Sequence, residues 1–242
     1  MVAIIVALVV TTLVLFAPRT PAGGPEPEAA DPTWAPPVDT PPRDGGSVSR
    51  IARLPDAEWV ARVAAATGIP ERALAAYAGA TIVKDRQMPE CGLSWTTLAG
   101  IAATESDHGR HGGATVREDG SVEPPIFGVA LDGGDTEHIP DSDDGAIDGD
   151  DEFDRAVGPF QLIPQTWRNW HVDANGDGVE DPHHIDDAAL ATANYLCRAV
   201  TGEGLDFTTE EGWRAGVAAF NSPESYLASV ARHAERYADA VR

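Results

Sequence analysis

From Pro55 onward, hydrophobic residues recur every three to four positions, which is the period of helices with one buried face. The pattern predicts helices over residues 56–67, 71–84, 93–106, 187–200, 211–220 and 223–241. Gly68 is placed to cap the first helix, and Pro70 to open the second as a first-turn proline. Between the third and fourth helices, as far as about residue 157, loop residues dominate and no convincing strand alternation occurs. We therefore expect one mainly α domain with a long irregular insertion.

The first 50 residues differ in character from this helical part. Residues 2–16 are uncharged and mostly aliphatic, which is short for a membrane-spanning helix but typical of an export-signal core. We expect residues 1–16 to be an export signal or a retained membrane anchor, with a buried core helix as the alternative. Residues 17–50 hold 9 of the 19 prolines and should form a disordered linker, which leaves residues 51–242 as the folded domain.

The net charge indicates which partners the chain can bind, and the cysteine content indicates whether it contains a disulfide. The formal net charge of −22 argues against binding to nucleic acid, because phosphate contacts require Lys and Arg. Contact with a membrane is expected only through the N-terminal segment, and we expect a monomer. Cys91 and Cys197 are the two cysteines, and in an exported protein such a pair indicates one disulfide closing a loop of about 105 residues. Two unlinked buried thiols are the alternative.

The insertion is strongly acidic. Residues 132–154 contain 11 carboxylates and no Lys or Arg. A long loop within a compact domain is usually functional or disordered. It can be a solvated acidic loop, or a loop stabilised by a cation, since neighbouring carboxylates repel one another unless a cation lies between them.

Glu105 is the candidate catalytic residue. On the predicted helix 93–106 it shares a stripe with Leu98, Ile101 and Ala102, so its carboxyl group projects from the apolar face. Burial there raises the pKa of a glutamate, and a carboxyl group that stays protonated at ambient pH can act as a general acid. The alternative is an ordinary solvent-facing charge in a last helical turn.

Four segments in order along the chain resemble those of lytic transglycosylases, the lysozyme-like enzymes that cut the glycan strands of peptidoglycan. They are the ending ESDHG at 105–109, AVGPFQLIPQTW at 156–167, DANGDGVEDPHHIDDAALATANYL at 173–196 and VAAFNSPESY at 217–226. The third is similar to the calcium loop of the membrane-bound B-type branch, and the flanking segments to secreted actinobacterial members. The resemblance covers roughly residues 55–242 and implies a lysozyme-like fold.

The resemblance also implies roles for individual residues. Glu105 matches the catalytic acid and base, Gln161 and Asn221 match residues that hydrogen-bond the N-acetylated sugars, and Tyr226 matches a tyrosine of the same segment. Two positions depart from the family pattern. Phe220 stands where the family usually has tyrosine, and Glu152 where the B-type branch has serine, so neither hydroxyl contact is supported.

A single carboxylate is sufficient in the resembled family. Hydrolytic glycosidases use two carboxyl groups, whereas Asp107 points about 200° away from Glu105 around the helix. The resemblance implies that Glu105 first protonates the MurNAc–GlcNAc β-1,4 oxygen and then deprotonates the 6-hydroxyl of the sugar, giving a 1,6-anhydro-MurNAc end. The alternatives are a lysozyme-type hydrolase with a second carboxylate from residues 141–154, and a non-catalytic module that binds the cell wall.

The loop from Asp173 onward carries the calcium signature. Aspartate or asparagine occupies positions 1, 3 and 5, the tight-turn glycine position 6, and Val179 can offer its carbonyl at position 7. The predicted structural Ca²⁺ ligands are Asp173, Asn175, Asp177, Val179 and Asp187, with Asp181 as an alternative oxygen donor. His184 stands where the usual glutamate would be. An ordinary turn without an ion is the other interpretation. No cofactor is expected for the chemistry itself.

Overall fold

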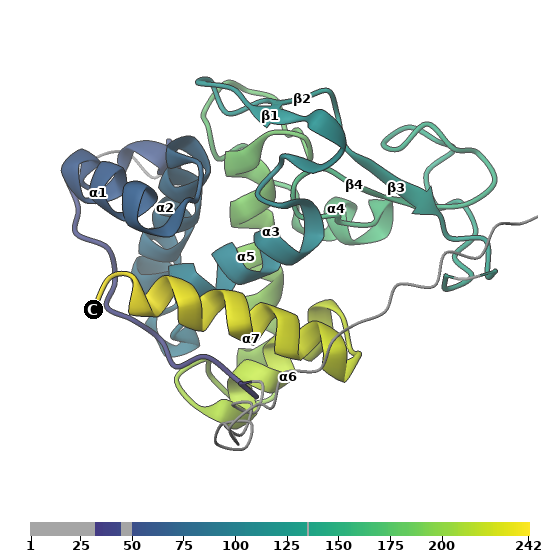
Figure 1. The fold of residues 1–242 in the computed structure, drawn as a ribbon. Helices are drawn as coiled ribbons and strands as arrows, with labels where there is room; N and C mark the ends of the chain where they lie inside the picture. Colours follow the sequence, from purple (N-terminus) through teal and green to yellow (C-terminus); the bar gives the residue numbers. More distant parts are fainter. Residues whose placement is uncertain (1–31, 45–49, 135) are drawn as a thin grey trace, which may run out of the picture. The chain divides into compact units, whose positions relative to one another are not determined.

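The computed structural model describes residues 32–44, 50–134 and 136–242 (Figure 1). The α-helices of these residues are α1 (Ala57–Thr67), α2 (Glu71–Gln87), α3 (Trp95–Ser106), α4 (Pro164–Trp170), α5 (Ile185–Gly202), α6 (Glu210–Phe220) and α7 (Glu224–Asp239). Three 3₁₀ turns accompany them, η1 (Ile51–Arg53), η2 (Pro89–Cys91) and η3 (His111–Gly113). The predicted export segment, residues 1–16, lies outside the described part of the chain. Across the part that is described, no helix combines the length and the apolar character needed to span a bilayer.

The helix ends follow local capping rules. The Asp56 side chain accepts a hydrogen bond from the Trp59 backbone N–H at 2.7 Å and starts α1, and Gly68 ends it with a left-handed φ of 74°. Pro70 is the N-cap of α2, one position before the first-turn position that the sequence predicts. The reason is that its ψ of 129° is extended, so the helix begins only at the next residue.

The core lies where α2, α3 and α5 meet, with α7 packed along α3 and α6 against α5. Its largest fully buried side chains include Trp95, Trp213 and Tyr77. The Trp213 indole N–H donates to the Thr97 hydroxyl at 3.1 Å, which satisfies the polar atom of a fully buried ring on α6. Figure 1 shows α3 and α7 side by side, and this pair carries the candidate active site.

The middle of the chain contains short strands, which the sequence pattern does not predict. They are β1 (Thr115–Val116), β2 (Val122–Glu123), β3 (Phe127–Ala130) and β4 (Arg155–Val157). β1 pairs with β2 and β3 with β4, both antiparallel. Strands of two to four residues are too short to show a clear alternation of apolar and polar positions. The short helix α4 is also absent from the predicted set, although the prediction of a mainly helical domain is confirmed.

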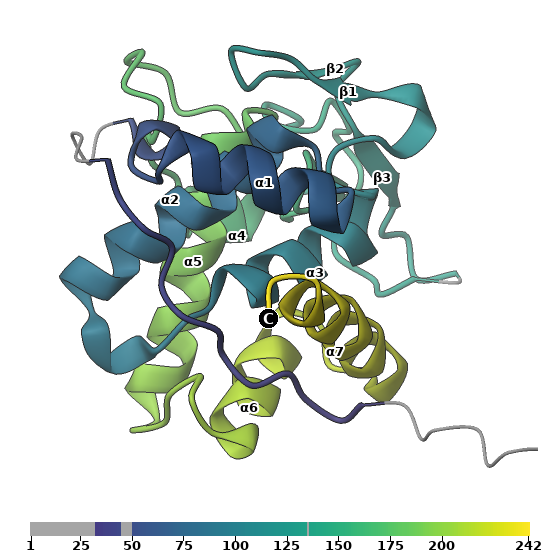
Figure 2. The ribbon, with the colours of Figure 1, turned by 60° about the vertical axis from the view of Figure 1, so that its left-hand side comes forward.

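Part of the predicted linker packs against the domain. Figure 2 shows residues 32–44, in purple, running past α6 toward α1. Arg214 of α6 donates to the Thr33 carbonyl at 2.9 Å, and the Asp56 N–H donates to the Pro42 carbonyl at 2.8 Å. Ala35 is 2% exposed. Composition predicts disorder for these residues because they contain little apolar side chain, but their backbone groups find partners on the helices.

The predicted disulfide is confirmed. Cys91 and Cys197 are bonded with their Cα atoms 5.3 Å apart, and they join η2 to α5. The bond closes a loop with a sequence separation of 106 residues. Such a crosslink stabilises the fold mainly by restricting the unfolded chain.

Candidate active site

Glu105 lies in the last turn of α3, on the face that packs into the domain. The helix starts at Ser94, whose hydroxyl accepts a hydrogen bond from the Thr96 N–H. Leu98, Ile101 and Ala102, which share the stripe with Glu105, are fully buried. Glu105 itself is half-buried, so its carboxyl group lies at the boundary between the core and the surface.

The Tyr226 hydroxyl donates a hydrogen bond to Glu105 Oε1 at 2.6 Å. Burial raises the pKa of the Glu105 carboxyl to about 7, and the hydrogen bond from Tyr226 opposes that rise by favouring the carboxylate. Burial and the neighbouring Glu105 also raise the pKa of Tyr226, so its phenol remains a donor. The tyrosine expected to contact sugar therefore contacts the candidate acid directly.

The described residues place no second carboxylate in hydrogen-bond contact with Glu105. Asp107, two positions later, is exposed and forms an ion pair with Arg110 at 2.7 Å. The carboxylates of the acidic insertion bond to backbone N–H groups, to Ser142 and to Arg155 instead. The side-chain hydrogen bond seen at Glu105 within the described residues is therefore that from the Tyr226 hydroxyl.

Gln161 is tied to the end of α3 through the segment that contains it. The Ser106 hydroxyl, next to Glu105, donates to the Pro159 carbonyl at 2.6 Å. Gln161 has a left-handed φ of 47°, and its side-chain amide donates to the Gly158 carbonyl at 2.9 Å. A Cβ atom at Gly128 of β3 would come within 3.1 Å of Gln161 Oε1, so this strand runs against the amide. The structure thus brings Gln161 to the end of the helix that bears Glu105.

Asn221 ends α6 as its C-cap, and its side chain is exposed. The preceding Phe220 stacks on Tyr226, with ring centroids 6.5 Å apart and an interplanar angle of 12°. Asn221 therefore follows the ring that covers the hydrogen-bond partner of Glu105. Phe220 lacks the hydroxyl group of the family pattern, but it keeps the aromatic face.

An aromatic row extends from this point, and sequence reasoning did not find it. Phe220 contacts Tyr195 at 6.2 Å between centroids, and Tyr195 contacts Trp170 at 6.0 Å. The Tyr195 hydroxyl donates to the Ala219 carbonyl at 2.5 Å, which fixes its ring on α6. Ligand sites are commonly lined by aromatic faces with a few polar groups. The available signal was one aromatic residue in each of three separate stretches of the chain, which does not reveal their contact in space.

The predicted calcium loop has a compact hydrogen-bonded turn. Asp173 accepts hydrogen bonds from the N–H groups of Gly176 at 2.7 Å and Gly178 at 2.9 Å, and Gly178 has a φ of 89°. Asp187 is fully buried and accepts from Ala174 at 2.8 Å. Its other carboxylate oxygen accepts from the Asp181 N–H at 3.0 Å. This donor set of carboxylates around a tight glycine turn fits a hard cation.

The remaining predicted ligands lie at the exposed side of this loop. Asn175 donates from its amide to the Asp177 carboxylate at 2.8 Å. Asp177 also accepts from the Val179 N–H at 2.7 Å, and the Val179 side chain is exposed. Among the residues that the structure describes, the predicted carboxylates of this loop do not form a group of three within 4.8 Å of one another.

A different set of carboxylates does gather in this way within the described residues, in the acidic insertion. Ligand atoms of Asp141, Asp143 and Asp154 lie within 4.8 Å of one another. Asp143 Oδ1 is buried without a hydrogen-bond partner, and Asp154 is fully buried. Burial, followed by the neighbouring Asp148 and Asp141, raises the pKa of Asp143. Most other residues from 141 to 153 lie in turns or bends and are exposed or half-buried, as in a solvated acidic loop. The alternative of an ion-stabilised loop would place its ion at these three aspartates.

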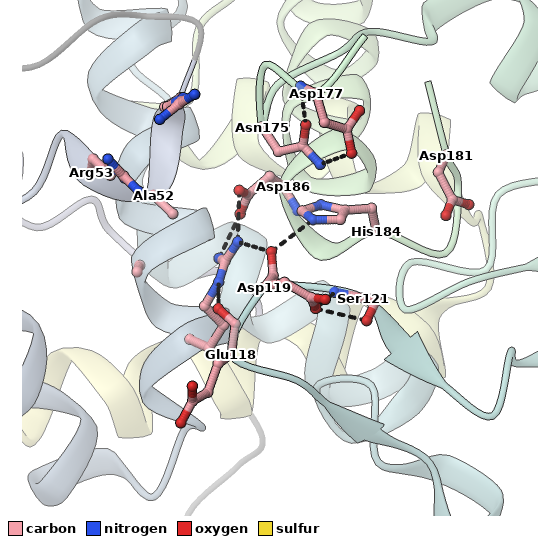
Figure 3. Close-up of a pocket in the computed structure, with 13 residues that line it drawn as sticks. Ala52, Arg53, Glu118, Asp119, Ser121, Asn175, Asp177, Asp181, His184 and Asp186 are labelled. Carbon is pink, nitrogen blue, oxygen red and sulfur yellow. Dashed lines mark hydrogen bonds and ion pairs between the residues drawn. The ribbon is translucent and has the colours of Figure 1, made fainter. Parts of the chain in front are cut away.

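A polar cavity of about 600 Å³ adjoins the predicted calcium loop (Figure 3). Arg72 and Asp186 both line it and form a two-pronged ion pair at 2.6 and 2.8 Å, and His184 contacts the Asp119 carbonyl at 2.9 Å. These contacts connect α2, the turn between β1 and β2, and the start of α5. Asp177 and Asn175 line the cavity from the opposite side, which leaves their oxygens accessible to solvent.

Comparison with known proteins gives one family. Residues 145–237 match the family described as the transglycosylase SLT domain. No curated protein and no solved structure matches the chain. The matched range contains Gln161, Asn221 and Tyr226, and Glu105 lies before it. The resemblance to lytic transglycosylases is confirmed at this level, without assignment to a branch.

Proposed function

We propose, from the match of residues 145–237 to the transglycosylase SLT domain family, that the chain cleaves peptidoglycan glycan strands without hydrolysis, with Glu105 as acid and base. The observation that carries the proposal is the half-buried Glu105 carboxyl group, whose pKa burial raises to about 7. At that pKa both protonation states are populated near neutral pH, as a residue that must donate and then accept a proton requires.

In the first step, protonated Glu105 donates its proton to the β-1,4 glycosidic oxygen between MurNAc and GlcNAc. The bond to the anomeric carbon breaks, and positive charge develops on the MurNAc ring. In the second step the Glu105 carboxylate accepts the proton of the 6-hydroxyl of that ring, whose oxygen bonds to the anomeric carbon. The products are a 1,6-anhydro-MurNAc end and a free GlcNAc 4-hydroxyl, and Glu105 regains its proton. A tethered nucleophile needs no second carboxylate to activate water.

The Tyr226 hydroxyl supports both steps. Its hydrogen bond to Oε1 leaves Oε2 as the oxygen that handles the proton, and it stabilises the carboxylate formed after the first transfer. We propose that sugar rings lie along the aromatic row of Phe220, Tyr195 and Trp170. Gln161 and Asn221 would supply the amide groups that bind N-acetyl substituents.

A peptidoglycan-acting domain and a disulfide fit an extracellular or periplasmic location. We propose that the N-terminal segment directs export, and that the chain acts as a monomer. The net charge of −22 is compatible with a glycan substrate held by hydrogen bonds.

We also propose that the loop from Asp173 to Asp187 holds a structural Ca²⁺. Asp173, Asn175, Asp177, the Val179 carbonyl and Asp187 would supply its oxygen ligands, with Asp181 close by. The support is the glycine turn at Gly178 and the buried Asp187 that closes the loop onto α5. The ion would fix the segment between Gln161 and α5, and it takes no part in proton transfer.

The experiment is digestion of purified peptidoglycan with the purified protein, with products identified by mass spectrometry. We expect anhydro ends, each lighter by one water than the corresponding reducing end. Glu105→Gln should abolish product formation, while Glu58→Gln, a matched change on the exposed first turn of α1, should not. Reducing ends would identify a hydrolase instead. Binding to the wall without any product, or full activity of Glu105→Gln, would identify a binding module or a different catalytic residue.

A further inference from the structure

The turn that ends α3 has an unusual backbone. Asp107 and His108 have φ values of 50° and 60°, so two consecutive residues other than glycine are left-handed. This conformation costs roughly 1–2 kcal/mol per residue. The His108 N–H donates to the Ala102 carbonyl at 3.0 Å, and the Asp107 N–H to the Ala103 carbonyl at 3.1 Å. The turn therefore closes directly over the helical turn that bears Glu105.

The His108 ring is held between two other helices. The side chain is 2% exposed, its Nδ1 lies 3.3 Å from the Tyr77 hydroxyl of α2, and its Nε2 lies 2.8 Å from the Tyr237 hydroxyl of α7. A buried imidazole is costly unless both nitrogens have partners, and here both have one. The strained turn and the satisfied ring together indicate that this position is fixed by tertiary contacts.

The burial of the Tyr77 hydroxyl favours one tautomer of His108. Tyr77 is fully buried and has no other hydrogen-bond partner among the described residues, so its hydroxyl proton is donated to His108 Nδ1. Nε2 then carries the proton and donates it to the Tyr237 oxygen, which also accepts from Arg236 at 3.1 Å.

His108 is not a pH switch. Burial lowers the pKa of His108 to about 3, so the ring is neutral near pH 7, where Glu105 titrates. The charged and titratable groups that face it are Asp107 and Arg110 in the turn, Tyr77 on α2, and His233, Arg236 and Tyr237 on α7. The two arginines and His233 also disfavour protonation, and only Asp107 favours it.

The helix α7 connects this ring to the candidate acid. α7 carries Tyr237, which bonds His108, and Tyr226, which bonds Glu105 Oε1. The two tyrosines are eleven residues apart, about 16 Å along the helix axis. α3 and the turn that follows it are therefore joined to α7 by the bond that Tyr226 donates to Glu105, by the bond between His108 and Tyr237, and by one between the Thr104 and Ser229 hydroxyls at 3.2 Å.

We propose that His108 is a positioning residue for Glu105: its neutral ring anchors α7 and α2 to the end of α3, and so keeps the Tyr226 hydroxyl on the Glu105 carboxyl and water away from it. This inference rests on the proposed function for its meaning in catalysis. The positional part concerns the environment of Glu105 alone and can be measured without substrate.

The direction of the effect follows from the two influences on Glu105. Burial raises its pKa and is the larger influence, while the Tyr226 hydrogen bond lowers it. If α7 shifts and water enters, both are lost, and the pKa falls from about 7 toward its ordinary value. Tyr226→Phe removes only the hydrogen bond and keeps the ring, so it should raise the pKa. The two variants therefore move the Glu105 titration in opposite directions.

The experiment compares the full chain with His108→Phe, His108→Gln, Tyr226→Phe and Thr97→Val. Thr97→Val is the matched control, because it removes a buried hydrogen bond from the same helix, to Trp213, away from Glu105. The Glu105 titration is followed by carboxyl ¹³C NMR, assigned by its loss in Glu105→Gln. The pH dependence of kcat/KM on peptidoglycan is measured in parallel.

In His108→Phe we expect the titration midpoint of Glu105 to fall by about one pH unit, and the alkaline limb of the kcat/KM profile to shift to lower pH by the same amount. Above the midpoint this shift is a roughly tenfold loss of kcat/KM. His108→Gln, whose amide can also donate and accept, should restore most of this shift. Thr97→Val should lower Tm and leave the midpoint unchanged. If His108→Phe fails to fold, Tyr237→Phe keeps the ring packing and should shift the midpoint in the same direction.

The proposal is overturned if His108→Phe and Tyr237→Phe both lower Tm, as Thr97→Val does, while the Glu105 midpoint stays at its wild-type value. A shift of the NMR midpoint in a protein that makes no anhydro product would leave the positioning role standing and remove the proposed function. If the wild-type protein makes the anhydro product but the Glu105 midpoint does not move in His108→Phe, the proposed function stands and the positioning role of His108 is removed.

Discussion

Replacing Glu105 by Gln should stabilise the protein at high pH at the expense of its chemistry. Burial raises the pKa of Glu105 from 4.5 to about 7, so the folded state binds this proton more tightly than the unfolded state does. Its contribution to stability is complete below pH 4.5 and is lost as the pH rises through 7. The difference of about 2.5 pKa units, at 1.36 kcal/mol per unit, gives roughly 3 kcal/mol.

Gln has the shape of the protonated acid and can still accept the hydrogen bond from Tyr226, but it never becomes charged. The Glu105→Gln protein should therefore be more stable than the wild type by roughly 3 kcal/mol at pH 8, and equally stable at pH 4. For a domain of this size, that corresponds to about 6–12 °C in Tm. Urea denaturation of both proteins from pH 4 to 8 measures the difference, and all other titrating groups cancel in the comparison. A stability difference between the two proteins that does not change with pH would refute the reasoning. It would mean that Glu105 has the same pKa in the folded and the unfolded state.

Three further predictions concern the framework of the site. Replacing Cys91 and Cys197 together by Ser should lower the free energy of unfolding by roughly 4–5 kcal/mol, from the loop of 106 residues, as measured by denaturation. An unchanged midpoint of denaturation would show that the crosslink contributes nothing. Deleting residues 32–44 should lower Tm by a few degrees while glycan cleavage persists, because this segment bonds α6 and α1 and does not contact Glu105. Loss of cleavage without loss of Tm would assign the segment to the active site. Added Ca²⁺ should raise Tm of the wild type and of Asp143→Ala, but not of Asp177→Ala. If Ca²⁺ instead raises Tm of Asp177→Ala but not of Asp143→Ala, the ion lies in the acidic insertion.

Much of the framework follows from properties that are local in the sequence. The helical period predicts where the main helices lie, because a helix repeats its buried face every 3.6 residues whatever it packs against. The same period places Glu105 on the stripe of Leu98 and Ile101, both of which are fully buried. The presence of two cysteines predicts one disulfide from the sequence, and the fold permits it by bringing the Cα atoms of Cys91 and Cys197 to 5.3 Å.

The environment of Glu105 depends on contacts between residues far apart in the chain. Tyr226, which donates to it, is 121 positions away, and Tyr237 is 129 positions from His108. A periodic pattern shows that a residue faces inward, but it does not show which residue of another helix it meets. The aromatic row, the packed segment 32–44 and the left-handed turn at His108 were missed for this reason. The sequence determines which helices form and which carboxyl group is the candidate acid. Only the tertiary packing around Glu105 decides that its pKa lies near 7, since desolvation and hydrogen bonding arise from neighbours in space.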